Sequence, residues 1–199
     1  MREEFDFISG RLCLDFANVL EDMRHPDPGL QYATLLRWSK QAGSLSAADL
    51  GRLAQRASRE AAKVAVVVDR AHDLAATLRR LFMAIVEEKR PNKADLDLLN
   101  TELGRAWGRL SVVQQDGAFA LDWPATSDAL DRLIWPVAHS AADLLVSADL
   151  DRLKACDADN CIYLFVDSSK SGRRRWCDMK ICGNRHKARR HREKLRAKT

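Results

Sequence analysis

The chain lacks several features that mark common classes of protein. No apolar run approaches the roughly 18 residues that a membrane span needs. The first seven residues, MREEFDF, are charged and have no apolar core of the kind found in secretory signals. Cysteine is scarce, with five in 199 residues. We therefore expect no membrane segment and a cytoplasmic, reducing location, in which structural disulfides are rare.

Motifs of catalysis are missing as well. The sequence has no phosphate-binding loop, no glycine-rich dinucleotide fingerprint and no HExxH motif. His25, His72 and His139 have no partner at the spacing of a metal site or a catalytic triad. We interpret them as ordinary surface or core histidines and predict that the protein is not an enzyme.

Four of the five cysteines form two pairs of equal spacing near the C-terminus. Cys156 and Cys161 enclose four residues, fifteen residues follow, and Cys177 and Cys182 repeat the first spacing. Four thiolates suit a closed tetrahedral Zn²⁺ site with no open position for catalysis. Disulfides, a redox pair and an iron–sulfur cluster are the alternatives.

The residues around these pairs predict a small metal-stabilised finger. Residues 162–166 form a β-rich run, residues 168–172 a turn, and residues 173–176 can return as a second strand. Asn184, after Gly183, is a good N-cap for the helix that follows. Knuckle, hairpin, knuckle and helix together are similar to a treble-clef finger. So short a segment buries little apolar surface, so metal binding would supply its folding energy.

This segment resembles the CGNR zinc finger. The likeness rests on WCDMKICGNR at residues 176–185, behind the first cysteine pair and the aromatic run. That bacterial module usually follows a helical domain called ABATE, and LCLDFAN at residues 12–18 resembles the start of such domains. Many ABATE domains have threonine next, where this chain has Val19. The resemblance implies a helical body, a zinc finger and a role in stress-induced regulation of transcription.

Charge separates the two parts of the chain. Residues 170–199 hold thirteen Lys and Arg against two Asp and Glu, whereas the rest of the chain has a net charge of −6. A basic end on a neutral-to-acidic body is typical of an appendage that binds phosphates, although a solvated tail has the same composition. Because a metal finger leads directly into the basic run, we favour nucleic acid, and double-stranded DNA in particular.

The basic helix is predicted to carry cations on two flanks, with a seam of Ala188, His191 and Leu195 that docks it on the hairpin. Such a helix could lie in a major groove, with Arg185 as the best candidate for reading guanine. In strand geometry Arg174 points away from its neighbours. The predicted nucleic-acid contacts are Arg173, Arg174, Arg175, Arg185, Lys187, Arg189, Arg190, Arg192, Lys194 and Arg196.

Residues 1–149 are predicted to form one helical domain and residues 150–199 the finger. Helices are expected near residues 10–21, 32–43, 46 onward, 60–88 and 92–107, with a β-hairpin at 110–123. A last long helix at 127–146 is expected to kink at Pro136, and Ser147 to cap a short helix before Cys156.

Several residues of the body have two interpretations. Cys13 is either a small buried side chain or a thiol sensor. Asp15 and Asn18 share a helix face and serve either packing or ligand binding. Tyr163 and Phe165, in the finger, fit its core better than a platform for stacking bases. The tryptophans either fill the core or line a pocket for a small-molecule effector: Trp38, Trp107, Trp123 and Trp135.

The sequence thus predicts a mainly α-helical DNA-binding regulator whose body acts in homodimerisation or effector sensing. The alternative is a small-molecule-binding or catalytic helical domain, anchored by its basic finger to RNA or other anionic partners. A protein–protein adaptor is a third reading, since zinc fingers also serve that role.

Overall fold

The computed structural model describes residues 5–20, 25–115, 117–123 and 129–196. These residues are mainly helical and carry two small antiparallel sheets, as predicted. None of the helices described is long and apolar enough to cross a membrane. Five helices come first in chain order: α1 (Leu12–Val19), α2 (Pro28–Gln41), α3 (Ala47–Ala57), α4 (Ala61–Val86) and α5 (Lys93–Trp107).

Three of these helices begin at side-chain caps. Ser46 Oγ accepts a hydrogen bond from the Asp49 N–H, and Asn92 Oδ1 accepts one from the Ala94 N–H. The Asp27 carboxylate caps α2 in the same way. Such caps satisfy backbone donors that the first helical turn leaves unpaired. The starts predicted at Ser46 and Asn92 are confirmed.

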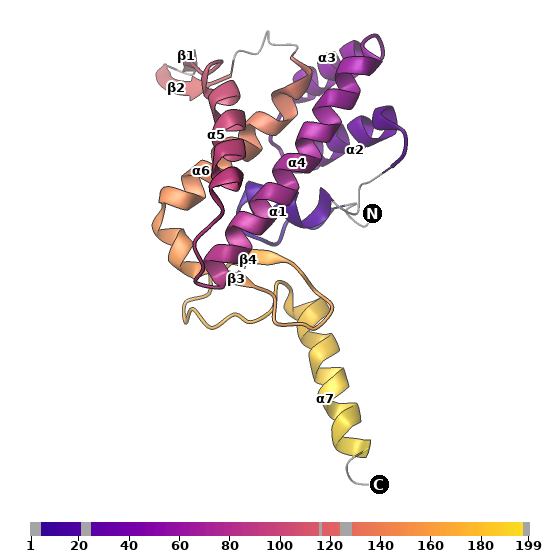
Figure 1. The fold of residues 1–199 in the computed structure, drawn as a ribbon, viewed down its shortest axis with the longest axis vertical. Helices are drawn as coiled ribbons and strands as arrows, with labels where there is room; N and C mark the ends of the chain where they lie inside the picture. Colours follow the sequence, from indigo (N-terminus) through magenta and orange to yellow (C-terminus); the bar gives the residue numbers. More distant parts are fainter. Residues whose placement is uncertain (1–4, 21–24, 116, 124–128, 197–199) are drawn as a thin grey trace.

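The long helix α4 is the centre of the body (Figure 1). It packs against α1, α2 and α5, while α6 (Trp135–Val146) contacts α1 and α5. Trp38 and Trp135 are fully buried, so these two tryptophans fill the core. The apolar side chains that α4 buries recur every three or four residues, the period of a helix face: Val64, Val67, Val68, Ala71, Leu74, Ala75, Leu78, Leu81 and Phe82.

The last helix of the body differs from its prediction. A 3₁₀ turn at Leu130–Ile134 comes first, and α6 begins at Trp135 with Pro136 in its first turn. Proline is tolerated there because its missing N–H would have no helical partner, so the predicted kink is wrong. Residues 124–128, where this helix was expected to start, lie outside the described residues.

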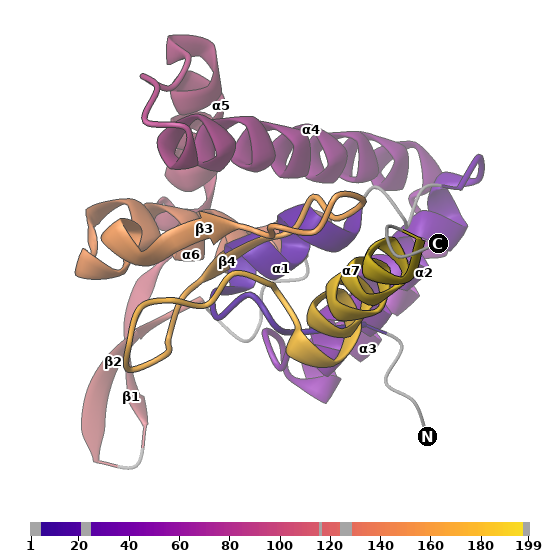
Figure 2. The same cartoon turned by 90° about the horizontal axis from the view of Figure 1, so that it is seen from below.

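Ser147 also differs in part from its predicted role. It is the N-cap residue of a short 3₁₀ helix (Ala148–Arg152), as predicted, but its hydroxyl makes no hydrogen bond to that helix and donates to the Leu144 carbonyl at the end of α6. The predicted hairpin is confirmed as β1 (Ser111–Gln115) and β2 (Ala118–Asp122), with Val112 opposite Leu121 and Gln114 opposite Phe119. It extends from the body in Figure 2.

The strand pairing expected inside the finger is wrong. Strand β4 (Leu164–Val166) pairs with β3 (Leu153–Ala155), which precedes the first cysteine, and residues 173–176 form no strand. The physical reason is burial: Leu153, Leu164 and Val166 belong to the same hydrophobic core as the helices. The boundary between residues 149 and 150 stays a prediction, and this core crosses it.

Candidate metal centre and nucleic-acid interface

The two cysteine pairs meet at one point. The sulfur atoms of Cys156, Cys161, Cys177 and Cys182, hereafter the four-cysteine cluster, all lie within 4.8 Å of one another. The Sγ atoms of Cys161 and Cys177 are 3.6 Å apart, and those of Cys177 and Cys182 are 3.7 Å apart. A disulfide needs about 2.0 Å, so these sulfurs are not bonded to each other.

The cluster has the dimensions of a metal site. Four sulfurs held about 2.3 Å from one ion at tetrahedral angles lie about 3.8 Å from each other. The two distances above are within 0.2 Å of that figure. The Cys177 N–H points at the Cys156 sulfur at 3.4 Å, a contact that stabilises a negatively charged ligand. The residues present therefore fit a four-thiolate metal site.

Apolar side chains shield the cluster on one side. Phe165 is fully buried against Cys156, Cys177 and Cys182, and Tyr163 and Trp176 pack partly against the same group. Phe165 is thus part of the finger core, as the sequence indicated, and is not exposed for stacking on bases. The Trp176 ring lies 5.5 Å from that of His186, which links the cluster to the start of α7 (Asn184–Arg196).

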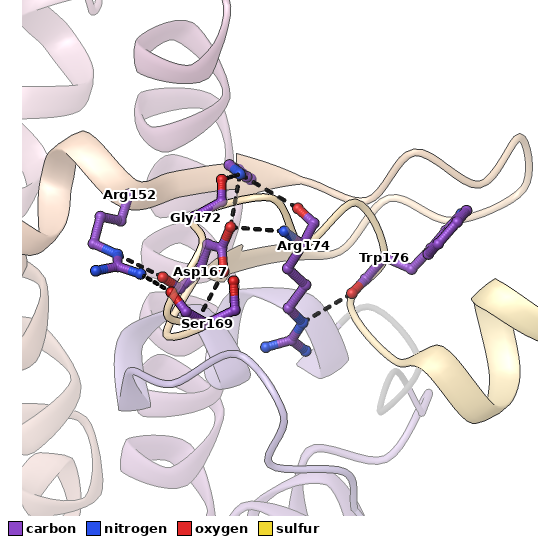
Figure 3. A network of polar contacts seen from close by, with 7 residues as sticks. Arg152, Asp167, Ser169, Gly172, Arg174 and Trp176 are labelled. Atoms are coloured by element: carbon purple, nitrogen blue, oxygen red, sulfur yellow. Dashed lines mark hydrogen bonds and ion pairs between the residues drawn. The ribbon is translucent and has the colours of Figure 1, made fainter.

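Asp167 organises the loop between the cysteine pairs (Figure 3). Its carboxylate accepts hydrogen bonds from the Lys154 ammonium at 2.7 Å and from the backbone N–H groups of Ser169 and Arg174 at 3.0 and 2.8 Å. These donors, Lys154 above all, hold the pKa of Asp167 far below its ordinary value. The side chain is fully buried. Sequence reasoning missed it, since an aspartate after a strand carries no signal of such a role.

Arg152, the last residue of the 3₁₀ helix that precedes β3, completes this network. Its guanidinium donates to the backbone carbonyls of Asp167 and Ser169, each at 2.5 Å. Figure 3 shows Arg152 and Arg174 on either side of the Asp167 loop. The path of residues 167–174 is therefore fixed by part-buried polar contacts to Asp167 and Arg152, whereas the sequence suggested a turn and a returning strand.

The three consecutive arginines divide as their alternation predicted. Arg174 turns inward, where it donates to the carbonyls of Trp176 and Cys177 and lies 4.5 Å over the Phe165 ring. Arg173 and Arg175 are exposed. Arg175 pairs with Asp157 at the surface. The inward contacts of Arg174 give it a structural role, and its nucleic-acid contact stays a prediction.

The entry to α7 begins earlier than expected. Asp178 is the cap, accepting from the Ile181 N–H at 2.9 Å, and a single π-helical turn (Met179–Gly183) leads into α7. Asn184 therefore continues a turn already formed, so its predicted N-cap role is wrong. At Gly183 a Cβ atom would lie 2.5 Å from the Met179 sulfur, which is the far end of a flexible, exposed side chain.

Helix α7 points away from the body (Figure 1). Ala188 is exposed, so it does not dock on the finger as predicted; the side chains of His191 and Leu195 lie outside the described residues. Arg189 forms ion pairs with Asp159 and Glu193. The side chains of Lys194 and Arg196, two predicted contacts, also lie outside the described residues. The cations exposed on the helix are Arg185, Lys187, Arg190 and Arg192.

Asn18 of α1 connects the body to the finger through hydrogen bonds of its side-chain amide. Its amide oxygen accepts the Leu164 N–H at 2.9 Å, and its amide nitrogen donates to the Leu164 carbonyl at 2.8 Å and to Ser9 Oγ at 2.7 Å. The Val166 N–H donates to the Ser9 carbonyl at 2.8 Å. Asn18 is buried, so it holds β4 in a fixed place. This supports packing over ligand binding for Asn18.

Asp15, one turn before Asn18 in α1, also supports the contact between the body and β4. Its carboxylate accepts the N–H groups of Ile8 and Ser9 at 3.1 and 3.0 Å, which shapes the segment that pairs with Val166. Burial raises the pKa of Asp15, against the lowering effect of the Ser9 contact. Its role in the structure is therefore packing.

Other candidate residues of the body show no common centre. The His72 ring contacts the side-chain oxygen of Gln31, and the Gln31 amide nitrogen donates to the backbone carbonyl of His25, at the rim of an open hollow. His139 lies between Trp107 and Trp123. Among the described residues, the four-cysteine cluster is the only group with the geometry of a metal site.

Comparison with protein families agrees with this architecture. The model of the ABATE family, described as "Putative stress-induced transcription regulator", matches residues 10–148. The chain belongs to the ABATE family. The model of the CGNR zinc finger matches residues 152–194, which contain the whole four-cysteine cluster. No curated protein matches the chain. The family indicates a regulator rather than an enzyme and agrees with a metal-binding finger.

Proposed function

We propose that this ABATE protein is a zinc-dependent transcriptional regulator that binds double-stranded DNA through α7. The observation that carries the proposal is the position of α7: it projects from the body beyond the four-cysteine cluster and exposes cations on several sides. A helix of 13 residues is about 20 Å long and fits a major groove, where cations on both flanks meet phosphates on both walls.

Zn²⁺ is the ion we propose for the four-cysteine cluster. Four thiolates favour zinc in a structural role, and the closed set leaves no position for a substrate. Bound metal would hold the first turn of α7 against the knuckle around Cys161. The chain itself contributes the Asp178 cap and the Trp176–His186 contact to the same task.

The proposed DNA contacts fall into two groups. Arg185, Lys187, Arg190 and Arg192 are exposed, and Lys194 and Arg196 continue the same helix. Arg175 and Arg189 are held in surface ion pairs, each worth at most about 1 kcal/mol, which phosphates can displace. Arg185 stands in the first turn of α7 and is proposed to read a base. Arg173 adds a contact from the loop.

The ABATE body is proposed to pair two chains and to carry any effector response. A single finger covers few base pairs, and one module buries only about 600–1,000 Å² of protein surface on DNA. Regulators with one module per chain commonly reach specificity as two-fold dimers. The tight contact between Asn18 and β4 would transmit a change in the body to the finger.

Metal analysis of the purified protein tests the first part of the proposal. One zinc per chain is expected, with no iron and no visible absorption from an iron–sulfur cluster. Replacement of Cys177 by serine should lower the zinc content strongly. A metal-free protein that is fully folded and binds DNA would contradict the zinc assignment.

Titration of labelled duplex DNA tests the second part. With four to six phosphate contacts, log K should fall against log salt with a slope of about −4 to −5. Arg190→Ala should weaken binding to every duplex and reduce that slope by about 1. Arg90→Ala, an exposed arginine on the body, is the matched control. Arg185→Ala should also relax preference at one base pair, at about 1–3 kcal/mol.

A competition experiment with nucleic acids of equal length tests which kind of nucleic acid the protein prefers. Duplex DNA should compete best. Stronger competition by single- or double-stranded RNA would favour the reading in which the finger anchors the body to RNA. Equal affinity for all duplexes, unchanged by Arg185→Ala, would leave only non-specific binding.

A further inference from the structure

The β1–β2 hairpin exposes an apolar face. Val112, Phe119 and Leu121 are 68%, 75% and 69% exposed. Cross-strand partners project on the same side of a sheet, and so do residues two apart. The pairing of Val112 with Leu121, and of Gln114 with Phe119, therefore places these three side chains on one face. Of the other large apolar side chains exposed in the described chain, Leu30, Val66 and Val146 stand alone on α2, α4 and α6, whereas Leu96 and Trp107 share α5 and Met179 and Ile181 share the π-helical turn.

The opposite face of the hairpin is smaller and more polar. Ser111 faces Asp122, and Val113, which is half-buried, faces Ala120. The hairpin thus turns its bulkiest apolar side chains away from the protein. A two-stranded sheet is marginally stable in water by itself, and an exposed apolar face adds an unfavourable contact with solvent. Both facts favour a cover for this face.

The composition of the hairpin restricts which kind of partner can cover its apolar face. Natural sheet edges are commonly protected by lysine or proline, yet residues 111–122 contain no Lys, Arg or Pro. The only charged residues in the segment are two aspartates, which repel phosphate, so nucleic acid does not fit. The face residues Val112, Gln114, Phe119 and Leu121 are all uncharged. Two copies of this face can therefore meet without like charges in contact.

The face is large enough to supply part of one side of a dimer interface. Three such side chains together with Gln114 expose on the order of 400–500 Å². A standard interface buries about 800 Å² on each partner. The face thus supplies more than half of one side, and the free outer edges of the two-stranded sheet lie directly beside it.

We propose that the β1–β2 hairpin is the dimerisation arm of this protein and that its occupant is the same face of a second copy. This deepens the proposed function, on whose pairing of chains it rests. In a two-fold arrangement the Val112, Phe119 and Leu121 side chains of one hairpin pack on those of the other. The hairpin and α7 lie at opposite ends of the molecule (Figure 1), so this contact leaves both fingers free.

Sedimentation velocity of the full zinc-loaded chain over a concentration series tests the arm. The wild-type protein should form dimers. Phe119→Lys together with Leu121→Lys should raise the dimer dissociation constant by roughly 30-fold or more, because two central apolar contacts become like charges. These side chains are largely exposed, so the fold should survive, as circular dichroism can check. Val146→Lys, at a valine of α6 that is 87% exposed, is the control and should leave the dimer intact.

Mixing opposite charges makes the test specific for contact between copies. The double-lysine variant and the corresponding double-glutamate variant should each be monomeric alone and form a mixed dimer together. A wild-type dimer that the lysine variant leaves unchanged would overturn the arm but keep the proposed pairing. A wild-type protein that stays monomeric at every concentration would overturn both. DNA titration of the same variants reports separately on the finger.

Discussion

Asn18 shows how one side chain connects two parts of the protein. An amide has one acceptor and two donors, and the peptide group of a strand offers the matching pair. Asn18 uses its oxygen and nitrogen on Leu164 and its second N–H on Ser9. Since all three contacts are buried, the loss of the amide would leave a backbone donor and acceptor unpaired.

We expect Asn18→Ala to lower the free energy of unfolding by about 1–3 kcal/mol. Hydrogen exchange should show faster exchange at Leu164 and Val166, whose N–H groups lie at this contact. Asn100→Ala, on the exposed face of α5, is the control and should change neither quantity. Unchanged protection of β4 in Asn18→Ala would mean that apolar packing alone holds the strand.

Cys13 is predicted to be chemically inert in the folded protein. It is fully buried, and burial raises the pKa of its thiol to about 12. Because the thiolate is the reactive form, almost none is present at pH 8. Mass spectrometry after brief iodoacetamide treatment should find Cys13 unmodified, with or without a chelator, and fully modified in denaturant. Rapid modification of native Cys13 would instead support a thiol sensor.

At the scale of elements, the finger is held by two different means. Strands β3 and β4 are part of the main hydrophobic core. The segment from Cys156 to Cys161 and the start of α7 surround the four-cysteine cluster. Helix α7 is short and highly charged, and such a helix is marginal in water without a fixed first turn. Metal should therefore stabilise only one of these two regions.

Removal of the metal by a chelator should unfold part of the finger. Hydrogen exchange is expected to become fast in α7 and around Cys161 and Cys182, while β4 and the body helices stay protected. The reason is that Leu164 and Val166 keep their contacts in the core. Excess zinc should restore the original pattern. Loss of protection in β4 together with α7 would show that the metal holds the whole finger.

At the scale of the whole molecule, the body and the finger form one structure. Arg79 of α4 donates to the Ile162 carbonyl, Asn18 binds Leu164, and the Ser9 carbonyl accepts the Val166 N–H. A metal ion at the four-cysteine cluster would not supply these hydrogen bonds between the body and β4. The body thus completes the fold of the segment between the cysteine pairs.

A fragment of residues 150–199 should accordingly bind zinc less tightly than the full chain. Leu164 and Val166 would be exposed to water in the fragment, so part of the metal-binding energy would be spent on ordering β3 and β4. Competition with a coloured chelator measures both affinities under the same conditions. Equal affinities would show that the finger folds independently of the ABATE body.

The sequence by itself determined the elements whose causes are local. Helices capped by Ser46 and Asn92 and the pairing of β1 with β2 follow from side chains close to each other in the chain. The cysteine pairs also gave the metal site, because ligand spacing is a property of the sequence.

Only the tertiary structure decided how β4 pairs, what Asn18 and Asp167 bind, and which arginine turns inward to a structural role. Periodicity placed a strand near residue 164 but could not choose β3 over residues 173–176 as its partner. That choice depends on burying Leu164 and Val166 against α4 and against α1, which is more than 140 residues away in the sequence, as the Asn18–Leu164 contact shows. Burial of this kind is a sum over the whole molecule, and no local pattern contains it.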